Sequence, residues 1–514
     1  MTAIGLWAIA ASSPEEPAVI APDGAAVSYA ELAREADRYG RGFQALGLVR
    51  GDAVATLLPN SVTALAAYFA AIETGLYIVP VNWHQVPTEI AYVLTDSGAG
   101  AFLADERFAE SAREAADLAG SKNRFAVGAV PGFEPASRLG DDGMHARPSP
   151  RTHGAPMLYT SGTSGRPKGV RRPLTGMDPD DTAVMAAWFF SLFDLAPFDG
   201  HVHLCGSPLY HTAVLNFATI SIQLGHPVVL MDGWDAQQSL RLIEAHRVTH
   251  THTVPTQFRR MLALPAEVRA RYDTSSLRAV IHSAAPCPAE VKRRMIDWLG
   301  PVVVEYYAAT EGGGTLITSQ QWLGKPGSVG LPWKGSQVRV LDRAGREVAP
   351  GEQGLVYMKM GTSSFTYHQD EEKTRASRAG GMFTVGDIGY TDSDGYLFLC
   401  DRGSDVIISG GVNIYPAEVE AELSCHPAVA DVAVFGIPHD DWGEEVKAVV
   451  EPVPGAEPGP GLTAELVEFL TGRVARFKLP RTIDYVAELP RDPNGKLYKR
   501  RLRDPYWAGR DRAI

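Results

Sequence analysis

The sequence contains few cysteines and no long uninterrupted hydrophobic segment. Only four cysteines occur among 514 residues, and none belongs to a C-x-x-C pair. This spacing offers no zinc framework and is typical of reduced thiols, so we expect a cytoplasmic protein. The apolar stretch 62–81 is interrupted by Glu73, Thr74 and Gly75, which indicates a helix followed by a strand and not a membrane span.

A surplus of positive charge and a basic leader are also missing. The formal net charge of -12 argues against nucleic acid as the main partner, because nucleic-acid binding usually requires a basic face. No lysine or arginine precedes Arg34, so we expect no secretion signal. The exception is a short basic tail, which we expect to be solvated: Lys496, Lys499, Arg500, Arg501 and Arg503.

Apolar runs of strand length alternate with amphipathic helical patterns over the first 310 residues. This alternation predicts an α/β fold with mostly parallel sheets covered by helices. The expected strands are 52–58, 76–81, 227–231, 249–254, 278–282 and 302–307, and the expected helices are 61–74, 235–246 and 288–299.

From about residue 325 the pattern changes to short strands separated by turn residues, which predicts a small antiparallel, barrel-like piece. After Arg402 we expect a compact α+β unit. We therefore predict a large N-terminal domain over residues 1–401 and a small, mobile C-terminal domain over 402–514. Its expected helices are 416–424 and 463–474, and its expected strands are 430–435, 445–450 and 483–486.

The segment "MLYTSGTSGRPKGV" at residues 157–170 combines hydroxyls and glycines around one lysine, Lys168. Backbone N–H groups, hydroxyls and an ammonium are what a polyphosphate needs. A Walker loop is excluded, because that motif places its lysine after the second glycine and opens a helix, whereas here Gly169 and Val170 follow the lysine. A Ser/Gly-rich linker would not need the apolar entry or the Pro-Lys-Gly exit.

Five further motifs follow in order: "PLYHT" (208–212), "YAATE" (307–311), "VGD" (385–387), "DRGSDVIISGGVNIYPAEVE" (401–420) and "LPRDPNGK" (489–496). With the loop, they resemble the signatures of the adenylate-forming superfamily, which includes acyl-CoA synthetases, luciferase and peptide-synthetase adenylation domains. Among these the chain is most similar to AMP-forming acyl-CoA synthetases. The resemblance covers nearly the whole chain and implies a C-terminal domain that swivels about a hinge at Ser404.

The resemblance also implies roles for individual residues in forming an acyl-AMP from ATP and a carboxylic acid. Lys496 would bridge the acid and the α-phosphate, Glu311 would hold Mg²⁺, and Thr310 would contact the α-phosphate. His211 would lie between the acyl pocket and the thiol entrance. The ATP and AMP contacts would be Thr160, Ser161, Gly162, Thr163, Lys168, Tyr307, Asp387 and Arg402.

The second substrate is expected to be coenzyme A. Gly410 and Gly411 would let a pantetheine arm pass close to the backbone, since they lack side chains. Trp442 and Phe477 match positions around the CoA nucleotide in some relatives, and Arg481 could contact its phosphate. Buried core aromatics are the alternative interpretation of the two rings. Three positions depart from the family pattern, namely Ala308, Val385 and Ser404, and none removes a group that the mechanism needs.

The candidate walls of the acyl pocket are mainly apolar or small: His211, Ala284, Ala285, Tyr306, Ala308 and Gly313. No cation among them would hold a second carboxylate, so we expect a hydrophobic monocarboxylic acid. Fatty, aromatic and polycyclic acids all remain open.

The sequence therefore predicts an ATP-dependent acid–CoA ligase that releases AMP and pyrophosphate. An enzyme that performs only one half-reaction, such as thioesterification of a supplied acyl-AMP, is the alternative, and a non-catalytic binding relative is less consistent with the intact motifs. A homodimer remains open. The alternating histidine pairs, His201 with His203 and His250 with His252, are expected to be structural and not metal ligands.

Overall fold

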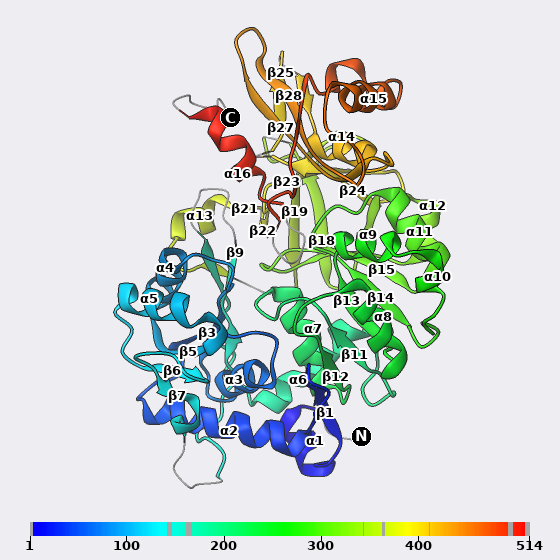
Figure 1. Cartoon of the computed structure of the whole chain (residues 1–514). Helices are drawn as coiled ribbons and strands as arrows, with labels where there is room; N and C mark the ends of the chain where they lie inside the picture. Colours follow the sequence, from blue (N-terminus) through cyan, green and yellow to red (C-terminus); the bar gives the residue numbers. More distant parts are fainter. Residues whose placement is uncertain are drawn as a thin grey trace. The chain divides into compact units, whose positions relative to one another are not determined.

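The computed structural model describes residues 4–140, 146–160, 167–342, 344–361, 365–403, 405–410, 412–491 and 497–508. They form two compact units, each assembled from segments that are separated in the sequence. The first unit comprises Met1–Thr253, Leu264–Ile281 and Thr362–Ala376. The second comprises Val254–Ala263, His282–Gly361 and Ser377–Ile514. Figure 1 shows the chain coloured along its sequence.

A six-stranded parallel sheet forms one part of the first unit, in the order β7-β6-β5-β3-β4-β8. Both of its faces are covered: Ala55 and Val79 pack with helices α4 and α5, whereas Val54 and Ile78 pack with α2 and α3. The strands are β3 (Ala53–Leu57), β4 (Tyr77–Pro80), β5 (Ala99–Asp105), β6 (Arg124–Val127), β7 (Glu134–Pro135) and β8 (Ala155–Pro156). The helices are α2 (Tyr29–Ala45), α3 (Val62–Glu73), α4 (Pro87–Ser97) and α5 (Ala109–Ala119).

Helix α3 shows why these predictions could be made from the sequence. The Ser61 hydroxyl accepts a hydrogen bond from the Ala64 N–H at 3.2 Å and so caps the first turn. The helix ends before Gly75, whose φ of 75° is a left-handed conformation that glycine adopts without strain. The predicted helix at 61–74 and the strands on either side of it are confirmed.

A second sheet of the first unit has the order β2-β1-β12-β11-β13-β14, with parallel pairing between β1, β12, β11 and β13. Its strands are β1 (Pro17–Ile20), β2 (Ala26–Ser28), β11 (His203–Cys205), β12 (Val228–Leu230), β13 (His250–Thr253) and β14 (Ala279–His282). The associated helices are α1 (Leu6–Ser12), α6 (Pro179–Ser191), α7 (Thr212–Gln223), α8 (Ala236–Ala245) and α10 (Ala266–Arg269). Strands β9 (Leu158–Thr160), β10 (Lys168–Arg171) and β20 (Thr366–Tyr367) form a small third sheet, and α13 (Glu371–Ala376) follows β20.

Five buried histidines cluster on and next to strands β11, β12 and β13 of this sheet: His201, His203, His226, His250 and His252. His203 on β11 is paired in register with His250 on β13, and their ring centroids are 4.7 Å apart. Phe217 stacks on His252 at 5.2 Å. Burial lowers the pKa of His203 and His252 to about 3 and that of His226 to about 4, and it also lowers the pKa of His201. Among the described residues, no group of three or more His, Cys, Asp or Glu side chains is arranged to hold a metal ion.

Mild acid should destabilise the first unit because these histidines gain protons when the chain unfolds. Their pKa is depressed in the folded state and lies near 6.5 in the unfolded state. Above pH 6.5 they are neutral in both states, so their burial costs no stability there. Stability is lost as the pH falls from 6.5 towards 4, by up to about 1.4 kcal/mol per pH unit for each histidine. The urea concentration at the midpoint of unfolding should therefore decrease when the pH is lowered from 7 to 5. It should fall less steeply in His203→Leu, and an unchanged pH dependence in that variant would contradict the assignment.

The second unit contains an antiparallel sheet in the order β15-β16-β17-β24-β23-β19-β22-β21, with β18 paired to β19. Its strands are β15 (Val303–Ala308), β16 (Gly314–Ile317), β17 (Ser328–Pro332), β18 (Ser336–Leu341), β19 (Gly354–Met360), β21 (Arg378–Ala379), β22 (Met382–Phe383), β23 (Asp387–Thr391) and β24 (Leu397–Arg402). Helices α9 (Pro255–Ala263), α11 (Ala289–Leu299) and α12 (Ser319–Gly324) also belong to this unit.

The C-terminal part of the second unit is a five-stranded sheet, β26-β25-β28-β27 with β29 paired to β28. Its core is formed by side chains from these strands and from helices α14 and α15, including Ile407, Val434 and Leu466. The strands are β25 (Ile407–Ser409), β26 (Val412–Ile414), β27 (Val429–His439), β28 (Gly443–Pro452) and β29 (Thr482–Tyr485). The helices are α14 (Pro416–Leu423), α15 (Pro460–Leu470) and α16 (Lys499–Arg503).

The predicted α/β fold is confirmed, with three corrections to its details. Antiparallel pairing begins already at β15 and β16, earlier than residue 325. Strands β27 and β28 are longer than predicted because they continue as a two-stranded ribbon to His439 and Gly443. Helix α15 begins at Pro460 and not at residue 463, because proline is well tolerated in the first helical turn. It ends at Leu470 and not at residue 474.

The predicted boundary between residues 401 and 402 falls inside the second unit, and the mobility of the segment after it stays a prediction. No helix in the described part of the chain is both long enough and apolar enough to cross a membrane.

Candidate active site

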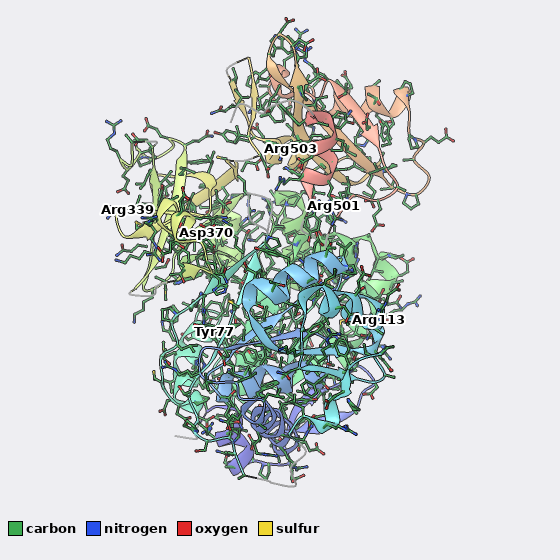
Figure 2. The ribbon with its side chains drawn as sticks, turned by 90° about the vertical axis from the view of Figure 1, so that its left-hand side faces the viewer. Tyr77, Arg113, Arg339, Asp370, Arg501 and Arg503 are labelled. Carbon is green, nitrogen blue, oxygen red and sulfur yellow. The ribbon has the colours of Figure 1, made fainter. Side chains whose placement is uncertain are left out.

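Lys168 lies in the first unit, on the strand that leaves the predicted phosphate-binding loop. Strands β9 and β10 are antiparallel, and Lys168 pairs with Thr160 across them. The Lys168 ammonium forms an ion pair with Asp370, which precedes α13 and is labelled in Figure 2. A hydrogen bond from Lys168 lowers the pKa of the Asp370 carboxyl. Residues Ser161, Gly162 and Thr163, and the side chain of Thr160, lie outside the part of the chain that is described.

Tyr307, Asp387 and Arg402 meet in the second unit, although 95 positions separate the first from the last. The Tyr307 hydroxyl donates to Asp387 Oδ2 at 2.7 Å, and Arg402 Nε lies 3.3 Å from Asp387 Oδ1. The β ladder explains the second contact, because Asp387 on β23 is the direct partner of Arg402 on β24. Burial and the neighbouring Asp387 raise the pKa of Tyr307 well above its ordinary value, so Tyr307 stays a hydrogen-bond donor.

Thr310 and Glu311 occupy the turn between β15 and β16. Glu311 is buried, with 6% of its surface exposed. The three glycines after it all have a positive φ, and a Cβ on Gly314 would lie 2.1 Å from the Tyr307 carbonyl oxygen. Only glycine fits this approach, which lets the chain reverse tightly between β15 and β16.

Strand β15 is anchored by a buried ion pair that the sequence analysis missed. Lys292 on α11 is fully buried, and its ammonium donates to Glu305 Oε2 at 2.6 Å. The ammonium also lies 5.0 Å from the centroid of the Trp322 ring. The signal was present in the sequence, because Lys292 falls on the same helical stripe as Val291, Met295 and Ile296, which are all buried.

The residues predicted to line the acyl pocket are divided between the two units. His211 immediately precedes α7 in the first unit, where its ring lies 4.3 Å from that of Tyr210. In the second unit the Tyr306 ring lies 6.4 Å from that of Trp333. Ala284 has a φ of 74°, a strained backbone conformation for a residue with a side chain and one that is frequent at functional sites. The remaining predicted residues of the second unit are Ala285, Ala308 and Gly313.

A pocket in the C-terminal sheet brings together four of the residues predicted to bind CoA, namely Gly410, Trp442, Phe477 and Arg481. Ser409, Val446 and Leu479 complete its lining. The Arg481 guanidinium carbon lies 3.5 Å from the centroid of the Trp442 ring. The His439 ring also stacks on the Trp442 indole, with ring centroids 4.5 Å apart.

The electrostatics of this pocket favour an anion. No carboxylate in the described ranges pairs with Arg481, whereas the nearby Lys478 is already bound to Glu418 at 2.6 Å. Phe477 exposes 54% of its surface, so its ring is accessible for stacking. The pocket therefore offers an aromatic surface on which a nucleotide base could stack and a guanidinium that could bind its phosphate.

Three further predicted residues, Lys496, Gly411 and Ser404, lie outside the described residues. Their predicted roles therefore stay predictions. The described neighbours of Lys496 are Arg491 and Leu497, which pair with each other in an isolated antiparallel bridge.

Comparisons with known proteins agree along the whole chain. The family described as AMP-binding enzyme matches residues 6–367, and its C-terminal domain matches residues 418–496. A feruloyl-CoA synthase from Amycolatopsis sp is 34% identical, over 97% of this chain and 98% of its own length. A fatty acid–[acyl-carrier-protein] ligase from Streptomyces coeruleorubidus is 32% identical, over 98% of this chain and 95% of its own length.

A solved structure gives the same result for the fold. The O-succinylbenzoate coenzyme A synthetase from Bacillus subtilis, in complex with ATP and magnesium ion, matches with a TM-score of 0.81 at 28% identity, covering 98% of each chain. With both family domains present in the expected order, this chain belongs to the AMP-binding enzyme family and hence to the adenylate-forming superfamily that its motifs resemble.

Proposed function

We propose that this protein is an ATP-dependent acid–CoA ligase that activates a hydrophobic monocarboxylic acid as its acyl-AMP and transfers the acyl group to coenzyme A. The observation that carries the proposal is the pocket formed by Gly410, Trp442, Phe477 and Arg481. These residues were assigned to CoA from the sequence, and they line one pocket with an available guanidinium. The CoA ligases among the relatives support the same reaction.

In the first half-reaction the carboxylate attacks the α-phosphate of ATP and pyrophosphate leaves. Both reactants are anions, so the site must supply positive charge and hydrogen-bond donors where charge develops. Lys496 would bridge the two anions, and Thr310 would donate to the α-phosphate. Asp387, held by Tyr307 and Arg402, would accept hydrogen bonds from the ribose hydroxyls.

The residues present fit a magnesium ion held mainly by substrate. Glu311 is a buried carboxylate, and no larger cluster of acidic or histidine ligands occurs in the described ranges. One protein carboxylate with phosphate oxygens and waters is a common arrangement for Mg²⁺, which would neutralise phosphate charge here. Lys168 and the loop residues Thr160, Ser161, Gly162 and Thr163 would hold the β- and γ-phosphates. Asp370 would then compete with ATP for the Lys168 ammonium.

In the second half-reaction the thiol of CoA attacks the acyl carbonyl, the C–S bond forms and AMP leaves. The pantetheine arm would pass Gly410 and Gly411, with the nucleotide in the pocket beside Phe477. Lys496 is not needed at this stage, so we propose that the segment 402–514 turns about Ser404 between the two steps.

The acid is proposed to be apolar because Tyr306, Ala308 and the two alanines at 284 and 285 offer no cation for a second carboxylate. The contact between Tyr306 and Trp333 adds an aromatic surface next to these residues. Fatty, aromatic and polycyclic acids all fit this description.

The proposal is tested by supplying each half-reaction separately. Purified protein with ATP, Mg²⁺, CoA and a panel of acids should yield acyl-CoA and AMP for at least one hydrophobic acid, as read by mass spectrometry. Synthetic acyl-AMP of the same acid should give the same product. Product from acyl-AMP alone would instead establish an enzyme of the second half-reaction, and no product from either source would overturn the proposal.

Replacing Lys496 should separate the two steps. Lys496→Ala should reduce acid-dependent pyrophosphate exchange by about 10²-fold or more, the effect of removing one preorganised electrostatic group. Conversion of synthetic acyl-AMP to the thioester should stay close to the wild-type rate, since thiol attack does not use this ammonium. Exchange at the wild-type level in this variant would remove Lys496 from the mechanism.

Replacing Arg481 should reveal whether the acceptor is free CoA. Arg481→Met should raise KM for CoA by about tenfold, as expected for losing one charged contact to phosphate, and should leave pantetheine, which has no nucleotide, unaffected. Lys478→Met is the matched control, because that nearby cation is already paired with Glu418. Equal KM values for CoA in wild type and Arg481→Met would count against the pocket and favour a carrier-protein thiol.

A further inference from the structure

The described residues on the two sides of the segment that carries Lys496 are paired with each other. Arg491 and Leu497 form an isolated antiparallel bridge, and the Tyr498 N–H donates to the Pro490 carbonyl at 2.8 Å. The described residues on the two sides of the segment, Arg491 and those after Leu497, are each held by a carboxylate of the same unit.

On the N-terminal side, Arg491 is held by Asp431 on β27. Its guanidinium makes two hydrogen bonds to the carboxylate, one from Nη2 to Oδ1 at 2.9 Å and one from Nε to Oδ2. Arg259 on α9 lies 2.9 Å from the same Oδ1. Burial alone would raise the pKa of Asp431, but the two guanidinium groups outweigh it and hold this pKa below its ordinary value. Next to this pair, Glu451 Oε2 accepts the Leu489 N–H at 2.9 Å.

On the C-terminal side, the anchor is Glu420 on α14. Lys499, the first residue of α16, lies 2.8 Å from Glu420 Oε1, and both side chains are at least four-fifths buried. Glu420 also accepts the Val434 N–H at 2.7 Å, which fixes the carboxylate to β27. Arg503 at the end of α16, labelled in Figure 2, lies 3.6 Å from Asp405.

We propose that Asp431 and Glu420 are positioning residues for acyl-AMP formation: through Arg491 and Lys499 they hold the two ends of the segment that carries Lys496. This inference rests on the proposed role of Lys496 in the first half-reaction. In-line attack on the α-phosphate is sensitive to displacements of about 1 Å, which can cost about 10²-fold in rate. Thiol attack on a finished acyl-AMP does not use Lys496, so it tolerates a looser segment.

The arginine side of the pair is the better place to test this proposal. If Asp431 were replaced, two guanidinium groups would lose their carboxylate, and unpaired buried charge is strongly destabilising. If Arg491 is replaced, Asp431 keeps Arg259 as its partner. Arg491→Met should therefore release the segment while preserving the fold.

The experiment compares three variants in both half-reactions. In Arg491→Met and in Lys499→Met, acid-dependent pyrophosphate exchange should fall by about tenfold or more. The rate of thioester formation from synthetic acyl-AMP should stay within about twofold, as should KM for ATP, because the segment acts in the transition state and not in binding. Arg491→Lys, which keeps a cation beside Asp431, should recover part of the exchange rate.

Lys447→Met is the matched control. Lys447 is a buried lysine of the same sheet, paired with Asp484 at 2.8 Å. Its ammonium also lies 5.1 Å from the Tyr506 ring, but it pairs with neither Asp431 nor Glu420. It should leave the ratio of the two half-reactions unchanged. A proportional loss of both half-reactions in Arg491→Met, or an unchanged exchange rate, would overturn the positioning role. If wild-type protein made no acyl-CoA from acyl-AMP, the proposed acceptor would be wrong, while exchange rates and thermal unfolding would still decide the role of Arg491.

Discussion

The hydrogen bond from Tyr307 to Asp387 connects the two halves of the proposed nucleotide site. Tyr307 is the second-last residue of β15 and lies three positions before Thr310, whereas Asp387 begins β23 and pairs with Arg402 at the end of β24. Because Asp387 is nearly buried, its charge depends on these two donors to offset the loss of solvation. The bond thus sets the distance between the turn that carries Glu311 and the strand that leads into the C-terminal sheet.

Behind this contact, buried charges hold the elements that carry the site. Lys292 and Glu305 connect α11 to β15, and Asp431 and Glu420 connect the end of the chain to β27 and α14. Buried ion pairs are weak evidence for stability, because desolvation offsets much of their attraction. Their directional hydrogen bonds do, however, favour one arrangement, which suits a site where reacting groups must align.

The fold was predictable where local signals agreed with the tertiary structure. Helix α3, with its Ser61 cap and the glycine after it, is one example, and the antiparallel strands after residue 325 are another, although antiparallel pairing begins earlier than predicted. The sequence underestimated β27 and β28, because their outer ends lack an alternating apolar pattern and are held by pairing with each other. Pairing between distant segments carries no signal in either segment alone.

The candidate site was predictable in the same uneven way. Motif residues such as Tyr307, Asp387 and Arg402 were found and are brought together, since each lies in a short recognisable segment. Asp370, which pairs with Lys168, and the ion pair of Lys292 with Glu305 were missed. They are ordinary residues whose role depends on contacts between distant segments of the chain. The signal of Lys292, a cation on an apolar helical stripe, points to a buried partner but does not identify it.

Gly314 limits how the specificity of this site can change. Any side chain there would collide with the Tyr307 carbonyl and, at 2.6 Å, with the Trp333 ring. The first collision is with the backbone of Tyr307, whose side chain donates to Asp387, so enlarging this position would disturb the proposed nucleotide site. If the proposed acyl pocket is correct, variation in the acid that is accepted would have to arise at other positions of its wall, such as Ala308, because a side chain at Gly314 collides with the backbone.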